Sequence, residues 1–341
     1  MIDLTINQSI LKKHKEFILG ENKENNNRLY KKLEKSLTEE KNESIKQILL
    51  FLINNIENTI VGNIYELERI RSEFCELRDS LHIIGKDRVN LYKKLKIFIK
   101  EYEYFYNSPN WNAYAFQQEL DITVCPYCNT QYIFNLEYNT GRTRATFDHF
   151  FDKTRYPFLA ISIYNLVPCC KVCNSDFKGR KETSLTTHYS PYETNISRHI
   201  TFSKEIYTHQ DREISPLESK GRNENIDYVS VILGNNNEFN IKINHINAND
   251  NMKKKIKGNK ELFFLEEIYN TYHKPYVQDI IIKAYIYNYT YRQQLTNTYS
   301  IFNNPEELKS SLIPSFDKDH KTLLGKLTRE IIEKETKHFM I

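Results

Sequence analysis

Residues 124–180 have the sequence VCPYCNTQYIFNLEYNTGRTRATFDHFFDKTRYPFLAISIYNLVPCCKVCNSDFKGR, which contains five of the six cysteines of the chain. Four of these cysteines form two Cys-x-x-Cys pairs, Cys125 with Cys128 and Cys170 with Cys173. Each pair can place two thiolates on one ion, and two pairs complete the tetrahedron that structural zinc prefers. The sequence therefore predicts a zinc site with four cysteine ligands, which staples a small domain together.

Two cysteines lie outside these pairs, and the pairs themselves could have roles other than zinc binding. Cys169 is adjacent to Cys170 and could replace it, but only Cys170 repeats the spacing of the first pair. We therefore expect Cys169, and also the distant Cys75, to be small buried apolar residues. The pairs could instead be a redox dithiol or two disulfides. Nothing near the N-terminus resembles a secretory signal peptide, which favours a reducing cytoplasm and disfavours disulfides.

Between and beside the cysteine pairs lie residue types that suit phosphodiester hydrolysis. Asp148 offers a hard anionic oxygen and Asn174 a hard neutral one, and both suit Mg²⁺, which neutralises charge on a phosphate. His149 titrates near neutrality and can take a proton from water. Because neighbouring side chains of a strand point to opposite faces, one of these residues can bind metal while the next faces water. Asn165, sixteen residues after His149, could hydrogen bond to the backbone across the intervening loop.

The order and spacing of these residues within the cysteine frame resemble the zinc-containing branch of the HNH, or ββα-metal, endonucleases. The resemblance is confined to residues 124–180 and implies a hairpin and a helix around one catalytic divalent ion, Mg²⁺ or Mn²⁺. By position, it makes Asp148 and Asn174 the ligands of that ion. It makes His149 the general base and Asn165 the residue that orients the loop.

Residues 148–157, with the sequence DHFFDKTRYP, also resemble HNH proteins of bacterial anti-phage systems such as the HNH subunit of Septu. In those proteins we would expect proline at the position of Asp152. The resemblance implies DNA as the substrate, a role in antiviral defence and a partner ATPase that controls the nuclease. The chain has no G-x-x-x-x-G-K-[ST] loop with which to bind ATP itself. Cutting both strands with one active site would need two copies or two binding events, which suggests a homodimer.

Basic side chains accompany this segment. A net charge of +4 permits nucleic-acid binding without demanding it. We expect the basic residues near the candidate centre to hold the phosphates that flank the scissile one, which gives affinity but little sequence specificity. The alternative is a solvated basic face. The residues are Lys153, Arg155, Lys171, Lys178, Arg180 and Lys181.

The periodicity of apolar residues predicts an α+β protein in three regions. The central region, residues 108–185 with one strand over residues 143–150, is the zinc-stapled ββα-metal core that the resemblance implies. It lies between a helical region of residues 1–107 and a C-terminal region of residues 186–341. The N-terminal region includes an apolar stripe over residues 45–60. The C-terminal region is predicted to contain a hairpin of residues 228–233 with 239–246, and helices that include residues 276–296.

Two function classes fit the sequence. The longest apolar run, residues 48–53, is too short to cross a bilayer, so we expect no membrane contact and a cytoplasmic location. The first class is the metal-dependent endonuclease described above. The alternative is a non-catalytic zinc module that binds nucleic acid or a partner protein.

Overall fold

The computed structural model describes residues 1–20, 28–138, 140–206, 230–231, 234–235, 239–299, 302–304, 307–308, 311 and 313–337. The chain divides into two compact units. One comprises Met1–Ile196 with Asp250–Gly258, and the other comprises Ser197–Asn249 with Asn259–Ile341. The N-terminal helical region and the segment that bears the cysteines therefore belong to the same unit. No helix within the described ranges is long and apolar enough to cross a membrane.

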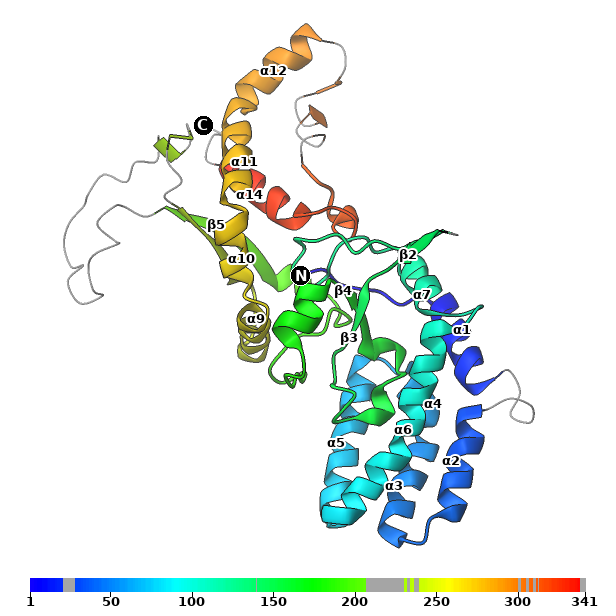
Figure 1. Cartoon of the computed structure of the whole chain (residues 1–341). Coiled ribbons are helices and arrows are strands. Elements are labelled where there is room, and N and C mark those ends of the chain that lie inside the picture. The colour runs from blue at the N-terminus through cyan, green and yellow to red at the C-terminus, as the bar shows by residue number, and fades with distance from the viewer. Residues whose placement is uncertain are drawn as a thin grey trace, which may run out of the picture. The chain divides into compact units, whose positions relative to one another are not determined.

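The first unit begins with a helical layer, in which α2, α3, α5 and α6 lie side by side (Figure 1). Asparagine side chains cap the N-termini of four helices by accepting hydrogen bonds from their first-turn N–H groups: Asn7, Asn42, Asn63 and Asn112. The helices are α1 (Gln8–Leu19), α2 (Arg28–Glu39), α3 (Glu43–Asn54), α4 (Ile56–Val61), α5 (Ile64–Ser80), α6 (Gly85–Asn107) and α7 (Ala113–Leu120).

The apolar stripe over residues 45–60 lies on two helices. Asn55 separates α3 from α4, and its side chain donates to the carbonyl of Phe51. Both helices still bury this stripe: Leu52 and Ile60 are fully inaccessible to solvent. The stripe is thus core, as apolar stripes at helical spacing usually are.

Two small antiparallel sheets follow the helices. Strand β1 (Leu136–Tyr138) pairs with β2 (Gly141–Thr143), and β3 (Thr146–His149) pairs with β4 (Leu166–Cys169). The single strand expected over residues 143–150 is therefore two strands, divided at Arg144 and Ala145. Between β3 and β4 lie two short 3₁₀ helices, η1 (Pro157–Leu159) and η2 (Ile163–Asn165), and β4 leads into a π-helix, η3 (Val172–Lys178).

The second unit contains the third sheet, in which β5 (Ile200–Ile206) pairs with β6 (Phe239–His245) along its whole length. The hairpin expected between residues 228–233 and 239–246 is not seen among the described residues: β6 pairs with β5, about thirty residues further back, and Ser230 and Val231 are helical. Most of residues 228–233 lies outside the described part of the chain. The expected helix over residues 276–296 is two helices, because Asn288 caps the second of them.

The remaining elements follow in chain order. They are η4 (Ile196–His199), α9 (Asp250–Leu262), α10 (Leu265–Tyr272), α11 (Lys274–Ile286), α12 (Tyr289–Thr298), η6 (Phe316–Lys318) and α14 (Gly325–Lys337). Within the second unit, α10 contacts β6, and α14 contacts both β5 and α11. The candidate site residues, Cys125 to Lys181, all lie in the first unit.

Candidate active site and cysteine cluster

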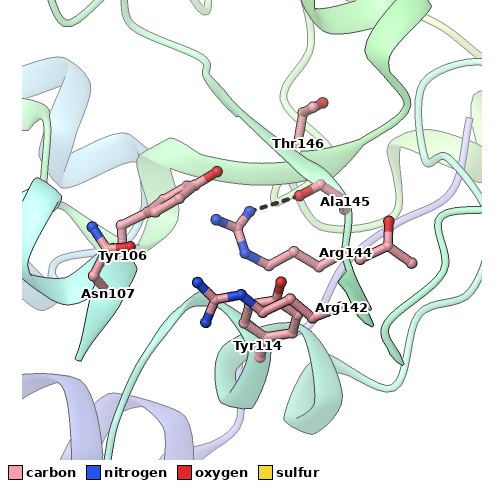
Figure 2. Close-up of a pocket in the computed structure, with 8 residues that line it drawn as sticks. Tyr106, Asn107, Tyr114, Arg142, Arg144, Ala145 and Thr146 are labelled. Carbon is pink, nitrogen blue, oxygen red and sulfur yellow. Dashed lines mark hydrogen bonds between the residues drawn. The ribbon is translucent and has the colours of Figure 1, made fainter. Parts of the chain in front are cut away.

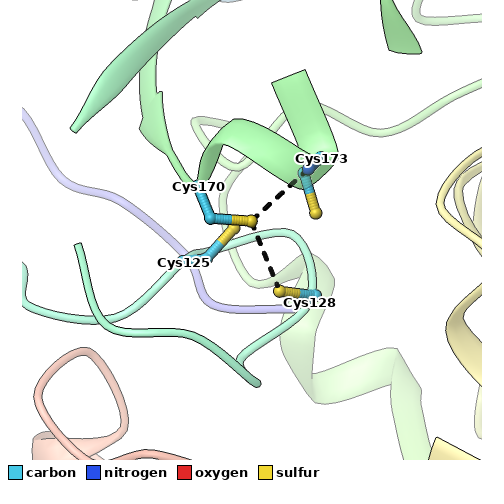
Figure 3. A group of neighbouring side chains, drawn as sticks. All are labelled: Cys125, Cys128, Cys170 and Cys173. Atoms are coloured by element: carbon cyan, nitrogen blue, oxygen red, sulfur yellow. Dashed lines mark hydrogen bonds between the residues drawn. The ribbon is translucent and has the colours of Figure 1, made fainter. Parts of the chain in front are cut away.

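Four cysteines from two distant segments meet in the first unit (Figure 3). The Sγ atoms of Cys125, Cys128, Cys170 and Cys173 all lie within 4.8 Å of one another, and all four side chains are buried. The Sγ atoms of Cys128 and Cys170 are 4.0 Å apart. A tetrahedron with metal–sulfur bonds of ~2.3 Å has edges of ~3.8 Å, so the four cysteines could hold a structural metal such as zinc.

A hydrogen-bonded backbone turn positions the first pair of cysteines, Cys125 and Cys128. The peptide N–H of Cys125 donates to the carbonyl of Gln131 at 2.9 Å, and Asn129 donates back to the carbonyl of Cys125 at 2.8 Å. Asn129 adopts the left-handed conformation that this tight turn requires, with φ of 56°. The thiol of Cys128 has a lowered pKa, because its neighbour Cys125 and the other two cysteines donate hydrogen bonds to it. A nearby cation would favour the thiolate forms of all four residues.

The other two cysteines are not members of the cluster. Cys169 is the last residue of β4, opposite Thr146, and it is buried. Cys170 follows directly, and because neighbouring side chains in an extended chain point to opposite sides, only one of the two can face the other cysteines. Cys75 on α5 is half-buried, so it differs from the fully buried residue that we expected.

The carboxylate of Asp148 is held on both oxygens. The hydroxyl of Tyr127 donates to Oδ2 at 2.7 Å, and the ammonium of Lys178 donates to Oδ1 at 2.8 Å. Lys178 also donates to the carbonyl of His149 at 2.6 Å. Burial raises the pKa of the Tyr127 phenol, which therefore stays protonated as a donor. Tyr127 lies between the first two cysteines, so it joins the cysteine cluster directly to Asp148.

Lys178 was expected to contact a phosphate, but it is buried and paired with Asp148 instead. Its side chain is 2% exposed and its charge faces Asp148. Asp148 and Asn174 have the hard oxygen donors that suit Mg²⁺. However, the Lys178 ammonium already compensates the carboxylate of Asp148. These residues would fit a divalent cation only if Lys178 moved away from Oδ1.

His149 is buried, and one of its two ring nitrogens forms a hydrogen bond. Nε2 lies 3.0 Å from the carbonyl oxygen of Ala160. Because a carbonyl can only accept, Nε2 carries the proton and donates. Burial lowers the pKa of His149 well below its ordinary value, and the positive charge of Lys153 lowers it further, so the imidazole is neutral near pH 7. Nδ1 then carries a lone pair, and no side chain or backbone group of the described residues hydrogen bonds to it.

His14 shows what a purely structural histidine looks like in the same fold. Its Nε2 lies 2.8 Å from the carbonyl oxygen of Ile161, next to the carbonyl that holds His149. Its Nδ1, however, accepts a hydrogen bond from the indole of Trp111 at 3.2 Å. Burial lowers the pKa of His14 to about 4. Both of its nitrogens have hydrogen-bond partners, whereas Nδ1 of His149 has none among the described residues.

The side chain of Asn165 hydrogen bonds to backbone groups at two places in the loop between β3 and β4. Its Oδ1 accepts from the N–H of Phe151 at 2.7 Å, and its Nδ2 donates to the carbonyls of Phe151 at 3.1 Å and Leu159 at 2.8 Å. The side chain is fully buried. Leu159 directly precedes Ala160, so Asn165 also fixes the carbonyl that sets the tautomer of His149.

Asn174 on η3 is half-buried and lines a hollow of about 370 Å³ beside β3. Lys153 lines the same hollow, and its ammonium lies 4.7 Å above the ring of Tyr102. The ring of Tyr102 in turn meets the His149 ring edge to face, with centroids 4.7 Å apart. Burial lowers the pKa of Lys153. The hollow thus brings together two expected site residues and a ring that touches the third, His149.

The other basic residues of the expected set are exposed. Arg155 is ion-paired with Glu182, and its Nε lies 3.9 Å from Oδ2 of Asp152. The remaining three are Lys171, Arg180 and Lys181.

Sequence reasoning missed two residues of the site, Tyr102 and Tyr127. Tyr127 had a signal, because it stands inside the first Cys-x-x-Cys pair and must lie close to whatever that pair contacts. Tyr102 had none, because it comes from α6, more than forty residues before His149, and only the tertiary fold brings the two rings together.

Comparisons of the chain with protein-family models, with curated proteins and with solved structures find no match. The functional proposals therefore rest on the residues of the chain itself.

Proposed function

We propose that this chain is a metal-dependent endonuclease of the HNH type, which hydrolyses phosphodiester bonds of DNA. The observation that carries the proposal is the state of His149. It is a neutral imidazole whose Nε2 is fixed by the Ala160 carbonyl and whose Nδ1 has no partner among the described residues. A buried, oriented base of this kind can deprotonate a water molecule beside a phosphate.

The surrounding residues support that role. The bond from Nε2–H to Ala160 selects the tautomer, and Asn165 holds the loop that carries Ala160. In the proposed reaction, Nδ1 takes the proton from water as the water oxygen bonds to phosphorus. The bond from phosphorus to one sugar oxygen breaks, and that oxygen leaves and takes up a proton from solvent. Lys153, in the hollow beside His149, supplies positive charge near the phosphate.

Two metals belong to the proposal. Zinc would be held by the four cysteines as a structural ion. Mg²⁺ or Mn²⁺ would be held by Asp148 and Asn174, and when bound it would neutralise charge on the phosphate. In keeping with the resemblance to anti-phage HNH proteins, we place the enzyme in bacterial defence in the cytoplasm, with a partner ATPase and a homodimeric form.

A second function is favoured by one observation. Both oxygens of Asp148 already have donors, and one donor is a buried ammonium. A centre closed in this way would suit a non-catalytic zinc module that binds nucleic acid or a partner protein.

Cleavage of supercoiled plasmid with Mg²⁺ or Mn²⁺ separates the two functions. Metal-dependent cutting should be abolished in His149→Ala and by EDTA. It should persist in a matched control, His245→Ala, whose side chain is exposed at the end of β6. Equal cutting by wild-type protein and His149→Ala would contradict the general-base role. A folded, zinc-bearing protein that cuts nothing, alone or with the products of neighbouring genes, would favour the second function.

A further inference from the structure

A second hollow adjoins the one that Lys153 and Asn174 line. Its volume is about 340 Å³ (Figure 2). Three residues line both hollows, so the two form one continuous surface beside β3: Tyr106, Asn107 and Thr146. The second hollow is further lined by Arg142, in the middle of β2, and by Arg144, just beyond its end. Neither was among the basic residues that the sequence singled out.

The side chain of Arg144 is fixed in place by aromatic rings. Its guanidinium carbon lies 3.7 Å from the ring centroid of Tyr106 and 5.1 Å from that of Tyr114. Figure 2 shows the side chain extended toward Tyr106, with Nη1 bonded to the carbonyl of Ala145 at 2.9 Å. Stacking of this kind holds the planar guanidinium in one orientation, so little freedom is lost when a ligand binds.

The donors of Arg144 are not used up by the protein. Its Nε is buried and has no acceptor in the described part of the chain. Neither Arg142 nor Arg144 forms an ion pair with a carboxylate there, whereas Arg71 pairs with Glu68. A buried donor without an acceptor is costly. The Arg144 side chain also lines the hollow, so a phosphate there could accept charge-assisted hydrogen bonds from its guanidinium.

We infer that Arg144, assisted by Arg142, is a phosphate-binding subsite for the DNA strand that leaves the proposed catalytic centre. This inference rests on the proposed endonuclease function. The strand would pass from the hollow at Lys153 and Asn174 into the hollow at Tyr106. There the guanidinium groups of Arg144 and Arg142 bind a phosphate next to the scissile one. This contact positions the DNA strand but does not distinguish its bases.

The test measures binding of a short fluorescent DNA duplex by anisotropy, in the His149→Ala background, between about 50 and 200 mM salt. Arg144→Gln should weaken binding by about tenfold, and the slope of log affinity against log salt should fall in magnitude by about 0.9, as for one lost phosphate contact. Arg142→Gln should act in the same direction. Because Arg142 is exposed, its variant decides the matter if Arg144→Gln does not fold.

A matched control is Arg88→Gln. Arg88 also lies over a tyrosine ring, Tyr92, at 5.6 Å, but it is eighteen residues before Tyr106 on α6 and hence about 27 Å away along the helix. It should leave affinity and slope unchanged. Wild-type affinity and slope in both Arg144→Gln and Arg142→Gln would overturn the subsite, and so would losses no larger than that of Arg88→Gln. Plasmid cutting would still support the endonuclease in that case. A protein that neither binds nor cuts DNA would overturn both.

Discussion

The ammonium of Lys178 lies 2.8 Å from Oδ1 of Asp148, and the side chains are only 2% and 3% exposed. A buried ion pair of this kind is expensive to break on one side, because the remaining charge is left without a partner. In the proposed nuclease, the same carboxylate would have to accept a divalent cation. The ammonium and the cation would then compete for one oxygen, so Lys178 would weaken the binding of that metal.

Replacing Lys178 with methionine should expose this competition. Without a divalent ion the variant should be less stable by about 3 kcal/mol, because Asp148 keeps a buried and uncompensated charge. Mg²⁺ or Mn²⁺ should restore much of that loss, so the melting temperature should rise more with metal in Lys178→Met than in wild-type protein. Thermal melts in EDTA and in Mg²⁺ measure both effects.

Lys255→Met is the control for that experiment. Lys255 forms a comparably buried ion pair with Glu193, and neither residue is a candidate site residue. It should lose stability to a similar extent and gain nothing specific from Mg²⁺. If the two variants respond equally to the metal, Asp148 is not a ligand.

The cleavage rate should depend on pH in an unusual way for a histidine base. An ordinary histidine has a pKa of 6.5, and burial lowers that of His149 well below this value. The imidazole therefore stays unprotonated, and able to accept a proton, through the whole range above its lowered pKa. Cleavage should not fall as the pH drops from 8 through 6.5. A rate that halves near pH 6.5 or above would show that His149 is ordinary or is not the base.

The link between the cysteine cluster and Asp148 predicts that two variants behave differently. Cys128→Ser should lose zinc and unfold the core, because a structural metal is bound only by the folded chain. Tyr127→Phe should keep one zinc per chain but lose about 1.5–3 kcal/mol, the value of a hydrogen bond to a charged acceptor. Zinc content and urea unfolding, measured on the same samples, distinguish them. A folded, zinc-free Cys128→Ser protein would count against the structural metal.

Local spacing predicts the cysteine cluster well, for a physical reason. The two members of each Cys-x-x-Cys pair are neighbours whatever the rest of the chain does, and the pairing of β3 with β4 needs only the loop between them to close. The sequence therefore predicts that Cys125, Cys128, Cys170 and Cys173 meet.

Pairing over longer distances was not predictable in the same way. The alternation of apolar residues in Phe239–His245 indicates a strand but does not identify its partner, which is Ile200–Ile206. The orientation of Lys178 was equally hidden. It ends a π-helix, Val172–Lys178, in which side chains do not follow the period of 3.6 residues, so its burial against Asp148 could not be derived from spacing.

His14 makes a last prediction, about stability. Its folded pKa is about 4 and its ordinary value is 6.5, so between these values the unfolded chain binds more protons than the folded one. Stability must therefore rise with pH in that window: the contribution is complete above pH 6.5 and is lost as the pH falls toward 4. The gap corresponds to about 3 kcal/mol at 1.36 kcal/mol per pKa unit.

Urea unfolding at pH 7.5 and pH 4.5 measures this contribution. His14→Gln should be less stable than wild-type protein at pH 7.5, because Trp111 loses its acceptor, but it should lose less stability on acidification. His149→Ala should reduce the acid loss by its own share, because burial lowers the pKa of His149 in the same direction. A wild-type loss that His14→Gln leaves intact would assign the acid sensitivity to other groups.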